Sequence, residues 1–138
     1  MTADMKTEMI LTQLPLFYTN LVIEKSNLLL RANMLEAQSL FDQAAELFAK
    51  SANIEAQLTA AAQQDGRLDA ALIHLVSEMS CWAAAGDTYH ALSRGQQMLA
   101  LPTLTAAQRT HIREFVDQVN QRRHAWMSSW RSPVPAIA

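Results

Sequence analysis

The side chains of this sequence that could do acid–base or metal chemistry are few and widely spaced. Its histidines fall on four separate stretches of the chain: His74, His90, His111 and His124. The nearest carboxylates along the chain are Glu78 after His74 and Glu114 after His111. A di-iron helical bundle needs Glu-x-x-His on two helices, whereas the order His111-x-x-Glu114 is reversed and has no second copy. The spacing therefore disfavours a metal site.

Nucleophilic chemistry has equally little support. The only cysteine, Cys81, lies between Ser80 and Trp82 with no Gly-rich or basic neighbour that would lower its pKa, so we expect a buried, inert thiol. A single cysteine cannot form an intramolecular disulfide or a multi-cysteine zinc site. The chain also lacks a Gly-rich phosphate loop, a GxSxG motif and an HExxH motif. We therefore expect no enzymatic activity, no catalytic residue and no cofactor.

Length, composition and charge limit the class of protein. The chain has 138 residues, half of them hydrophobic, which suits one core, and we expect a single domain over residues 1–131. A net charge of -2 and a pI near 6.0 disfavour nucleic acid and anionic membranes as partners. Asp4 and Glu8 are unlike the basic start of a signal peptide, and no apolar run is long enough to span a bilayer. We expect a soluble cytoplasmic protein.

Residue usage predicts an all-α fold of about five helices. The chain has only 3 Gly and 4 Pro, is rich in helix formers, and shows no alternation of β-branched residues. Pro15 is expected to open or kink a long first helix that reaches about residue 38, with a shorter helix over 1–14 before it. Thr105 and Gln108 form a capping box that opens the last helix. The later helices are expected over 42–64, 69–85, 87–101 and 105–127, with a disordered tail at 132–138.

A turn pattern recurs three times, in which a small residue is followed five positions later by alanine. The segments run from Ser39 to Ala44, from Gly66 to Ala71 and from Gly86 to Ala91. The small residue permits a tight turn, and the alanine allows the new helix to close against the previous one. An acid within each segment, Asp42, Asp69 or Asp87, is expected to cap the new helix. The pattern predicts antiparallel helical hairpins.

The segment SLFDQAAELFAKSA, from Ser39 to Ala52, resembles the second helix of a tetratricopeptide hairpin. The matching residues are Ser39 for the family's glycine, Phe41 and Phe48 for its aromatics, Asp42 for its acid and Ala44 for its alanine. The first helix of that hairpin is matched by Leu28, Ala32 and Leu35. A second match contains Gly86, Asp87, Ala91 and Pro102, preceded by Leu75, Met79 and Trp82. The resemblance covers roughly residues 21–102.

Three features depart from the family's pattern. Met79 replaces a small residue, Gly95 replaces the second aromatic, and the two matched alanines lie farther apart than one standard repeat. The resemblance implies a right-handed array of stacked hairpins, whose first helices line a concave surface that binds proteins or peptides. Asn33 matches one asparagine of the family's carboxylate clamp, but Leu29 stands in place of the clamp lysine and Ser77 in place of a second asparagine. That clamp is therefore disfavoured.

The candidate partner-binding surface consists of residues that the resemblance places on the first helices. These residues are Ser26, Leu29, Asn33, Glu36, Ile73, Val76 and Ser80. The alternative is that Leu29, Ile73 and Val76 simply belong to the core.

Two further patterns could contribute to binding. Leucines recur every seven residues, at Leu14, Leu21, Leu28 and Leu35, but Glu24 and Lys25 fall where a zipper needs apolar residues. We expect these leucines to pack in the core or to form a short patch for self-association. A C-terminal patch combines basic and aromatic residues: Arg122, Arg123, Trp126, Trp130 and Arg131. This patch could bind RNA, an anionic membrane surface or an acidic protein, or it could be an ordinary helix end whose cations complement the dipole.

The sequence thus favours a function that depends on shape and burial. We expect an interaction module or adaptor that binds a protein or peptide and self-associates, as a homodimer or a larger homo-oligomer, through the first helix, whose apolar runs 21–23 and 28–30 spread around much of its circumference. The alternative function is RNA or membrane binding through the C-terminal patch.

Overall fold

The computed structural model describes the backbone of residues 2–131, and the side chains of residues 16–131 except Trp126, Ser129, Trp130 and Arg131. Five helices follow one another: α1 (Thr2–Ala37), α2 (Phe41–Gln64), α3 (Leu68–Ala84), α4 (Thr88–Leu99) and α5 (Ala106–Arg131). No strand occurs within residues 2–131, so the predicted all-α fold is confirmed. The tail expected at 132–138 lies outside the described residues.

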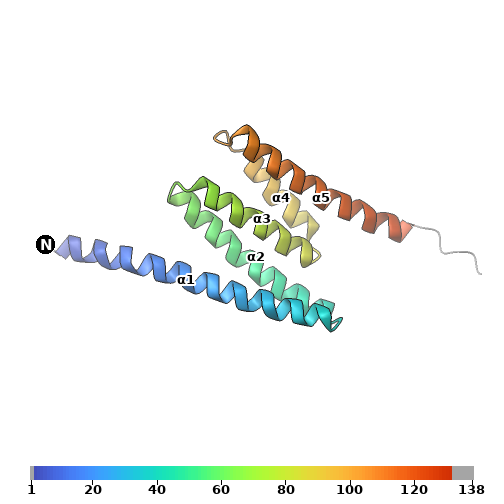
Figure 1. Ribbon diagram of the computed structural model, residues 1–138, viewed down its shortest axis with the longest axis horizontal. Helices are drawn as coiled ribbons and strands as arrows, with labels where there is room; N and C mark the ends of the chain where they lie inside the picture. Colours follow the sequence, from blue (N-terminus) through green and yellow to red (C-terminus); the bar gives the residue numbers. More distant parts are fainter. Residues whose placement is uncertain (1, 132–138) are drawn as a thin grey trace, which may run out of the picture.

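The five helices form a stack in chain order. Figure 1 shows α1 along one edge, α2 and α3 crossing the middle, and α4 and α5 at the opposite edge. Helix α2 packs between α1 and α3, while α4 packs between α3 and α5. Helices α1 and α2, and likewise α3 and α4, are joined by short turns into antiparallel hairpins (Figure 1). The right-handed tetratricopeptide-like arrangement of these hairpins stays a prediction.

Pro15 does not divide the N-terminal region into two helices as expected. Helix α1 runs without interruption from Thr2 to Ala37. A proline removes one hydrogen bond of the i to i−4 ladder, and the bonds on either side can hold the helix together. The first helix is therefore a single element, and its buried and exposed residues lie on different sides of it.

The three turns predicted from the sequence have the same geometry. Their small residues all adopt positive φ: 62° at Ser39, 71° at Gly66 and 83° at Gly86. The next backbone N–H in each turn donates back across the helix end, from Leu40 to Leu35, from Arg67 to Ala62 and from Asp87 to Trp82, each at 2.9 Å. This is the Schellman arrangement, which satisfies carbonyls that the helix leaves unpaired.

The alanine five residues after each turn residue is buried as expected. Ala44 is 2% exposed, and Ala71 and Ala91 are fully buried. A methyl group at these positions allows the second helix of each turn to lie close against the first. The repeated sequence pattern thus corresponds to a repeated physical contact.

The acids behave differently from the expectation in two of the three turns. The Asp87 carboxylate accepts a hydrogen bond from the His90 backbone N–H at 3.0 Å and caps α4. Asp42 and Asp69 instead lie in the first turn of α2 and α3, whose N-caps have no side-chain hydrogen bond. They lie two residues past the cap, where a carboxylate favours the helix through the dipole only. The capping box at Thr105 is confirmed, with both reciprocal bonds to Gln108 formed.

Gly95 and Met79 together explain the departures from the tetratricopeptide pattern. A Cβ atom at Gly95 would lie 2.8 Å from the Met79 Cε atom and 2.6 Å from the Val116 Cγ2 atom. Met79 is fully buried. The large side chain on α3 therefore occupies the space that an aromatic on α4 would fill, and Gly95 leaves room for it and for α5.

Three of the four leucines at intervals of seven belong to the interface between α1 and α2. Leu21 is buried, and Leu28 and Leu35 pack at the margin of the core. The side chain of Leu14 lies outside the described residues. Core packing is therefore confirmed for Leu21, Leu28 and Leu35.

Ser39 provides a test of the shared turn geometry. Because serine at positive φ is strained relative to glycine, Ser39→Gly is expected to raise the free energy of unfolding by about 0.5–1 kcal/mol. Urea unfolding followed by circular dichroism measures this change. Gly66→Ala makes the opposite change at the equivalent position and should lower the free energy of unfolding by about 1 kcal/mol. No atom lies within 4 Å of the added Cβ, so the cost comes from backbone strain at positive φ. An unchanged stability in both variants would contradict the turn geometry.

Candidate interaction surface

The predicted surface residues on α1 do not all face solvent. Ser26, Asn33 and Glu36 are exposed, and the Ser26 hydroxyl donates to the Val22 carbonyl at 2.9 Å. Leu29 is half-buried and packs against two groups of core residues. The core alternative therefore fits Leu29, and the other three remain available for contact.

The predicted surface residues on α3 are also divided. Ile73 is 68% exposed, so the core alternative is wrong for this residue. Val76 is half-buried, and its carbonyl accepts a hydrogen bond from the exposed Ser80 hydroxyl at 2.9 Å. Ser80 lines a small cavity of about 180 Å³ together with Phe115 and Arg122 of α5. One end of the predicted surface therefore meets the predicted C-terminal patch.

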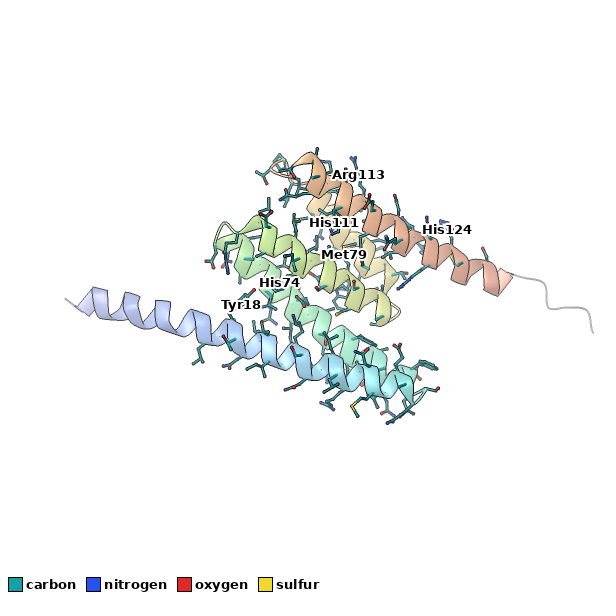
Figure 2. The ribbon with its side chains drawn as sticks, in the orientation of Figure 1. Tyr18, His74, Met79, His111, Arg113 and His124 are labelled. Carbon is teal, nitrogen blue, oxygen red and sulfur yellow. The ribbon has the colours of Figure 1, made fainter. Side chains whose placement is uncertain are left out.

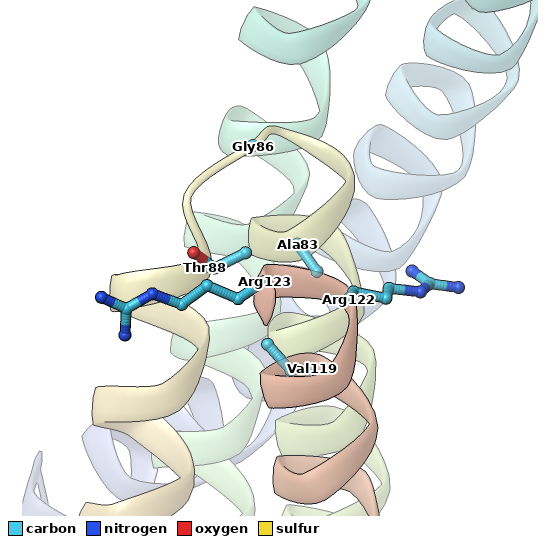
Figure 3. Close-up of a pocket in the computed structure, with 6 residues that line it drawn as sticks. All are labelled: Ala83, Gly86, Thr88, Val119, Arg122 and Arg123. Atoms are coloured by element: carbon cyan, nitrogen blue, oxygen red, sulfur yellow. The ribbon is translucent and has the colours of Figure 1, made fainter. Parts of the chain in front are cut away.

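The C-terminal patch is only partly described. Arg122 and Arg123 are exposed, and both line a cavity of about 410 Å³ whose other walls are Ala83, Gly86, Thr88 and Val119. In Figure 3 the two guanidinium groups extend to opposite sides, away from the space between them. The side chains of Trp126, Trp130 and Arg131 lie outside the described residues. The two described arginines therefore do not converge on a shared anion.

An exposed row of apolar side chains lies on α1, the helix expected to self-associate, but its residues were not among the predicted surface residues. Four side chains on the side of α1 opposite α2 are more than half exposed: Leu16 (62%), Ile23 (54%), Leu30 (62%) and Met34 (55%). Asn20 and Asn27, both exposed, lie between them on the same side. We call these six residues the outer seam of α1. The spacing of seven from Leu16 to Ile23 to Leu30 was visible in the sequence, but the parallel series of buried leucines hid it.

The inner side of α1 meets a buried carboxylate on α2. Glu55 is only 1% exposed, and its two oxygens lie 2.8 Å from the Lys25 Nζ atom and 2.8 Å from the His74 Nδ1 atom. The Tyr18 hydroxyl lies 2.5 Å from the other ring nitrogen of His74. Since the carboxylate accepts, Nδ1 carries a proton; in the neutral ring, Nε2 then accepts from the Tyr18 hydroxyl. We call these four residues the Glu55 cluster; Figure 2 shows Tyr18 reaching from α1 toward His74 on α3.

The sequence interpretation paired His74 with the wrong carboxylate. Glu78, four residues later on α3, is also 1% exposed but accepts from Arg94 Nε at 2.8 Å and from Trp82 Nε1 at 3.0 Å. The His90 ring stacks on Trp82 with centroids 3.8 Å apart and planes at 10°. The partner of His74 is Glu55, which lies nineteen residues earlier on another helix. Such pairings across helices depend on tertiary structure and have no local sequence signal.

Both buried carboxylates have their hydrogen-bond partners within the fold. Within the described side chains, every buried nitrogen or oxygen has a hydrogen-bond partner, and no group of three or more His, Cys, Asp or Glu residues could hold a metal ion. Lys25 and His74 connect α1 and α3 to Glu55 on α2, and Arg94 connects α4 to Glu78 on α3. The two carboxylates therefore have a structural role in joining neighbouring helices.

Cys81 is buried, as predicted. Burial raises the pKa of its thiol to about 11, with a further rise from the negative charges of Glu55 and Glu78 and a partial opposing effect of Lys25. At neutral pH the sulfur atom is therefore a protonated thiol, which is a poor nucleophile.

Comparisons with known proteins give no relatives. No family model, curated protein or solved structure matches this chain. Among the described residues, no helix combines the length and apolar character needed to cross a membrane. Support for a function therefore comes from the geometry of the exposed surfaces of α1, α3 and α5.

Lys25 provides a test of the Glu55 cluster. Lys25→Met should lower the free energy of unfolding by about 3 kcal/mol, because it leaves a buried carboxylate without its main cation. The double variant Lys25→Met with Glu55→Met should be more stable than Lys25→Met alone, since it removes the uncompensated charge. Urea unfolding of both variants measures the difference. A single variant within 0.5 kcal/mol of the original protein, roughly the limit for a surface substitution, would contradict the assignment.

The raised pKa of the Cys81 thiol predicts that the folded state loses stability at alkaline pH. The ordinary thiol pKa is 9.0 and the folded value is about 11. Between these values the unfolded chain ionises while the folded chain does not, so the folded state loses stability as pH rises above about 9. Thermal unfolding from pH 7 to 10.5 should show this loss, and Cys81→Ala should reduce its slope. A thiol reagent should react with the native protein at pH 8 far more slowly than with the urea-unfolded chain.

Proposed function

We propose that this protein is a non-catalytic interaction module, a tetratricopeptide-like array of helical hairpins that binds a protein segment through a helical surface and self-associates. The observation that carries the proposal is the outer seam of α1. Its four large apolar side chains are more than half exposed and lie in line on one helix. A monomeric protein seldom leaves apolar side chains aligned in this way unless they bind a partner.

The charged and polar groups of the molecule fit the same interpretation. The Glu55 and Glu78 carboxylates are fully partnered inside the fold, and the Cys81 thiol has a raised pKa. The two carboxylates join neighbouring helices and so stabilise the scaffold. The function proposed here therefore relies on burial of apolar surface between proteins, which is the dominant favourable term in most protein association.

The alternative function is RNA or membrane binding through the C-terminal patch. Exposed Arg122 and Arg123 beside a cavity support it. The net charge of -2 and the divergence of the two guanidinium groups weigh against it (Figure 3). Anion binding would be strongly salt-dependent, whereas binding through an apolar surface would not.

Affinity capture from cells that express the protein, with quantification by mass spectrometry, tests the proposal. We expect the full chain to retain specific proteins, including further copies of itself, in 0.5 M salt, chosen as a concentration that strongly screens surface charges. Ile23→Asp with Leu30→Asp should remove these proteins, because two charges in the outer seam oppose burial. Tyr89→Asp is the matched control, because Tyr89 on α4 is 80% exposed and belongs neither to the predicted partner-binding surface nor to the outer seam.

The result that would contradict the proposal is equally specific. Retention that is unaffected by the seam substitutions, is lost in 0.5 M salt and disappears in Arg122→Gln with Arg123→Gln would favour the alternative function. Binding of a fluorescent single-stranded RNA, or flotation with vesicles rich in phosphatidylserine, would then identify the ligand class.

A further inference from the structure

The outer seam of α1 has the residue pattern of a two-stranded coiled coil. We propose that its occupant is a second copy of this chain, with the two α1 helices parallel and in register. The inference rests on the proposed function, because it identifies one partner for the surface that carries that function. It also adds a specific geometry, in which Asn20 and Asn27 each face their own counterpart.

The outer seam follows a heptad repeat. Leu16, Ile23 and Leu30 occupy one seam position, and Asn20, Asn27 and Met34 occupy the other, in steps of four and three. Alternating steps of four and three keep a row of side chains on one side of a helix that winds around a partner. At 1.5 Å per residue the row extends for about 28 Å. All six side chains are exposed, so the row is available for contact.

The asparagines determine which partner fits. An asparagine buried in an otherwise apolar seam loses its water and needs a hydrogen-bond partner. A second copy in parallel register supplies that partner at both layers, since each amide meets an identical amide at the same height. Asparagine at this heptad position is also known to specify register in two-stranded coiled coils at some cost in stability.

An antiparallel pair of the same helices fits less well. In that orientation the two seam positions face each other, so Asn27 would meet Leu30 or Ile23 of the second copy and its amide would have no partner. The antiparallel pair would bring Glu24 close to Arg31, but an ion pair between exposed side chains contributes little. In the parallel pair no like charges meet along the margins. Because the antiparallel pair leaves asparagine amides without a hydrogen-bond partner, the parallel orientation is favoured.

The rest of the fold leaves room for this dimer. The side of α1 that packs inward carries Tyr18, Lys25 and Ala32, which recur every seven residues directly opposite the outer seam. Figure 1 shows α2 to α5 all on that inner side of α1. A second copy laid along the outer seam would therefore place its own α2 to α5 on its far side. Neither set of helices would obstruct the contact.

Sedimentation velocity of the full chain over a range of concentrations is the first test. We expect a monomer–dimer equilibrium, and Leu30→Asp should weaken dimerisation at least tenfold while the far-UV circular dichroism spectrum stays unchanged. Tyr89→Asp, the control on α4, should leave the equilibrium unchanged. A chain that stays monomeric at all concentrations, or a dimer that Tyr89→Asp disrupts and Leu30→Asp does not, would overturn the proposal.

Disulfide trapping tests the orientation. In a Cys81→Ser background, Asn27→Cys should form a covalent dimer under mild oxidation, because the two sulfurs would meet at the same height in the seam. Glu36→Cys, exposed but away from the seam, should remain largely monomeric. Mixing Asn27→Cys protein with Leu30→Cys or Ile23→Cys protein covers the antiparallel registers. A mixed dimer that forms in preference to the Asn27→Cys homodimer would overturn the parallel arrangement.

The two proposals can fail separately. A monomeric chain that still captures other proteins, and loses them on Leu30→Asp, would refute the second-copy inference and the self-association in the proposed function, but would support binding of another protein through the outer seam. A chain that neither dimerises nor captures proteins through the outer seam would refute both.

Discussion

The ion pair between Lys25 and the buried carboxylate of Glu55 determines how α1 lies on the rest of the molecule. Apolar residues surround much of this helix, so burial of apolar area alone would allow several rotations about its axis. A carboxylate at 1% exposure cannot be left without a cation, because an unpaired buried charge costs several kcal/mol. The rotation that brings Lys25 to Glu55 also places Tyr18 against His74 and Ala32 in the core. The same rotation turns Leu16, Ile23 and Leu30 outward.

Helix α3 is the element through which the polar contacts pass. His74 connects it to Glu55 on α2 and to Tyr18 on α1, and Glu78 connects it to Arg94 on α4. Between these two sites lies Cys81, whose thiol remains protonated because its surroundings are buried and carry negative charge. The fixed polar contacts give the stacked hairpins defined positions along and around each helix. The binding surface on α1 is therefore held in place by a scaffold whose geometry depends on these buried polar contacts.

Much of the fold could be predicted from residue type and spacing. The three turns at Ser39, Gly66 and Gly86 were identified because tight turns need small residues and close helix approach needs alanine, and both requirements are local. The ends of α2 to α5 were predicted to within four residues. The break at Pro15 and the caps at Asp42 and Asp69 were wrong, since a proline does not always interrupt a helix and a cap depends on one backbone position. Five of the seven predicted surface residues are plainly exposed on helices α1 and α3 without outlining a common cavity: Ser26, Asn33, Glu36, Ile73 and Ser80.

The sequence by itself determined that the chain is helical, where it turns, and that its chemistry-bearing residues are sparse. These properties follow from interactions within a few residues along the chain. Only the tertiary structure decided that His74 pairs with Glu55, that Met79 fills the space beside Gly95, and that the leucines at Leu21 and Leu28 face inward while Leu16 and Leu30 face out. A helix with two apolar faces can bury either one. Which face is buried depends on polar residues on other helices, such as Glu55, that need an ion-pair or hydrogen-bond partner.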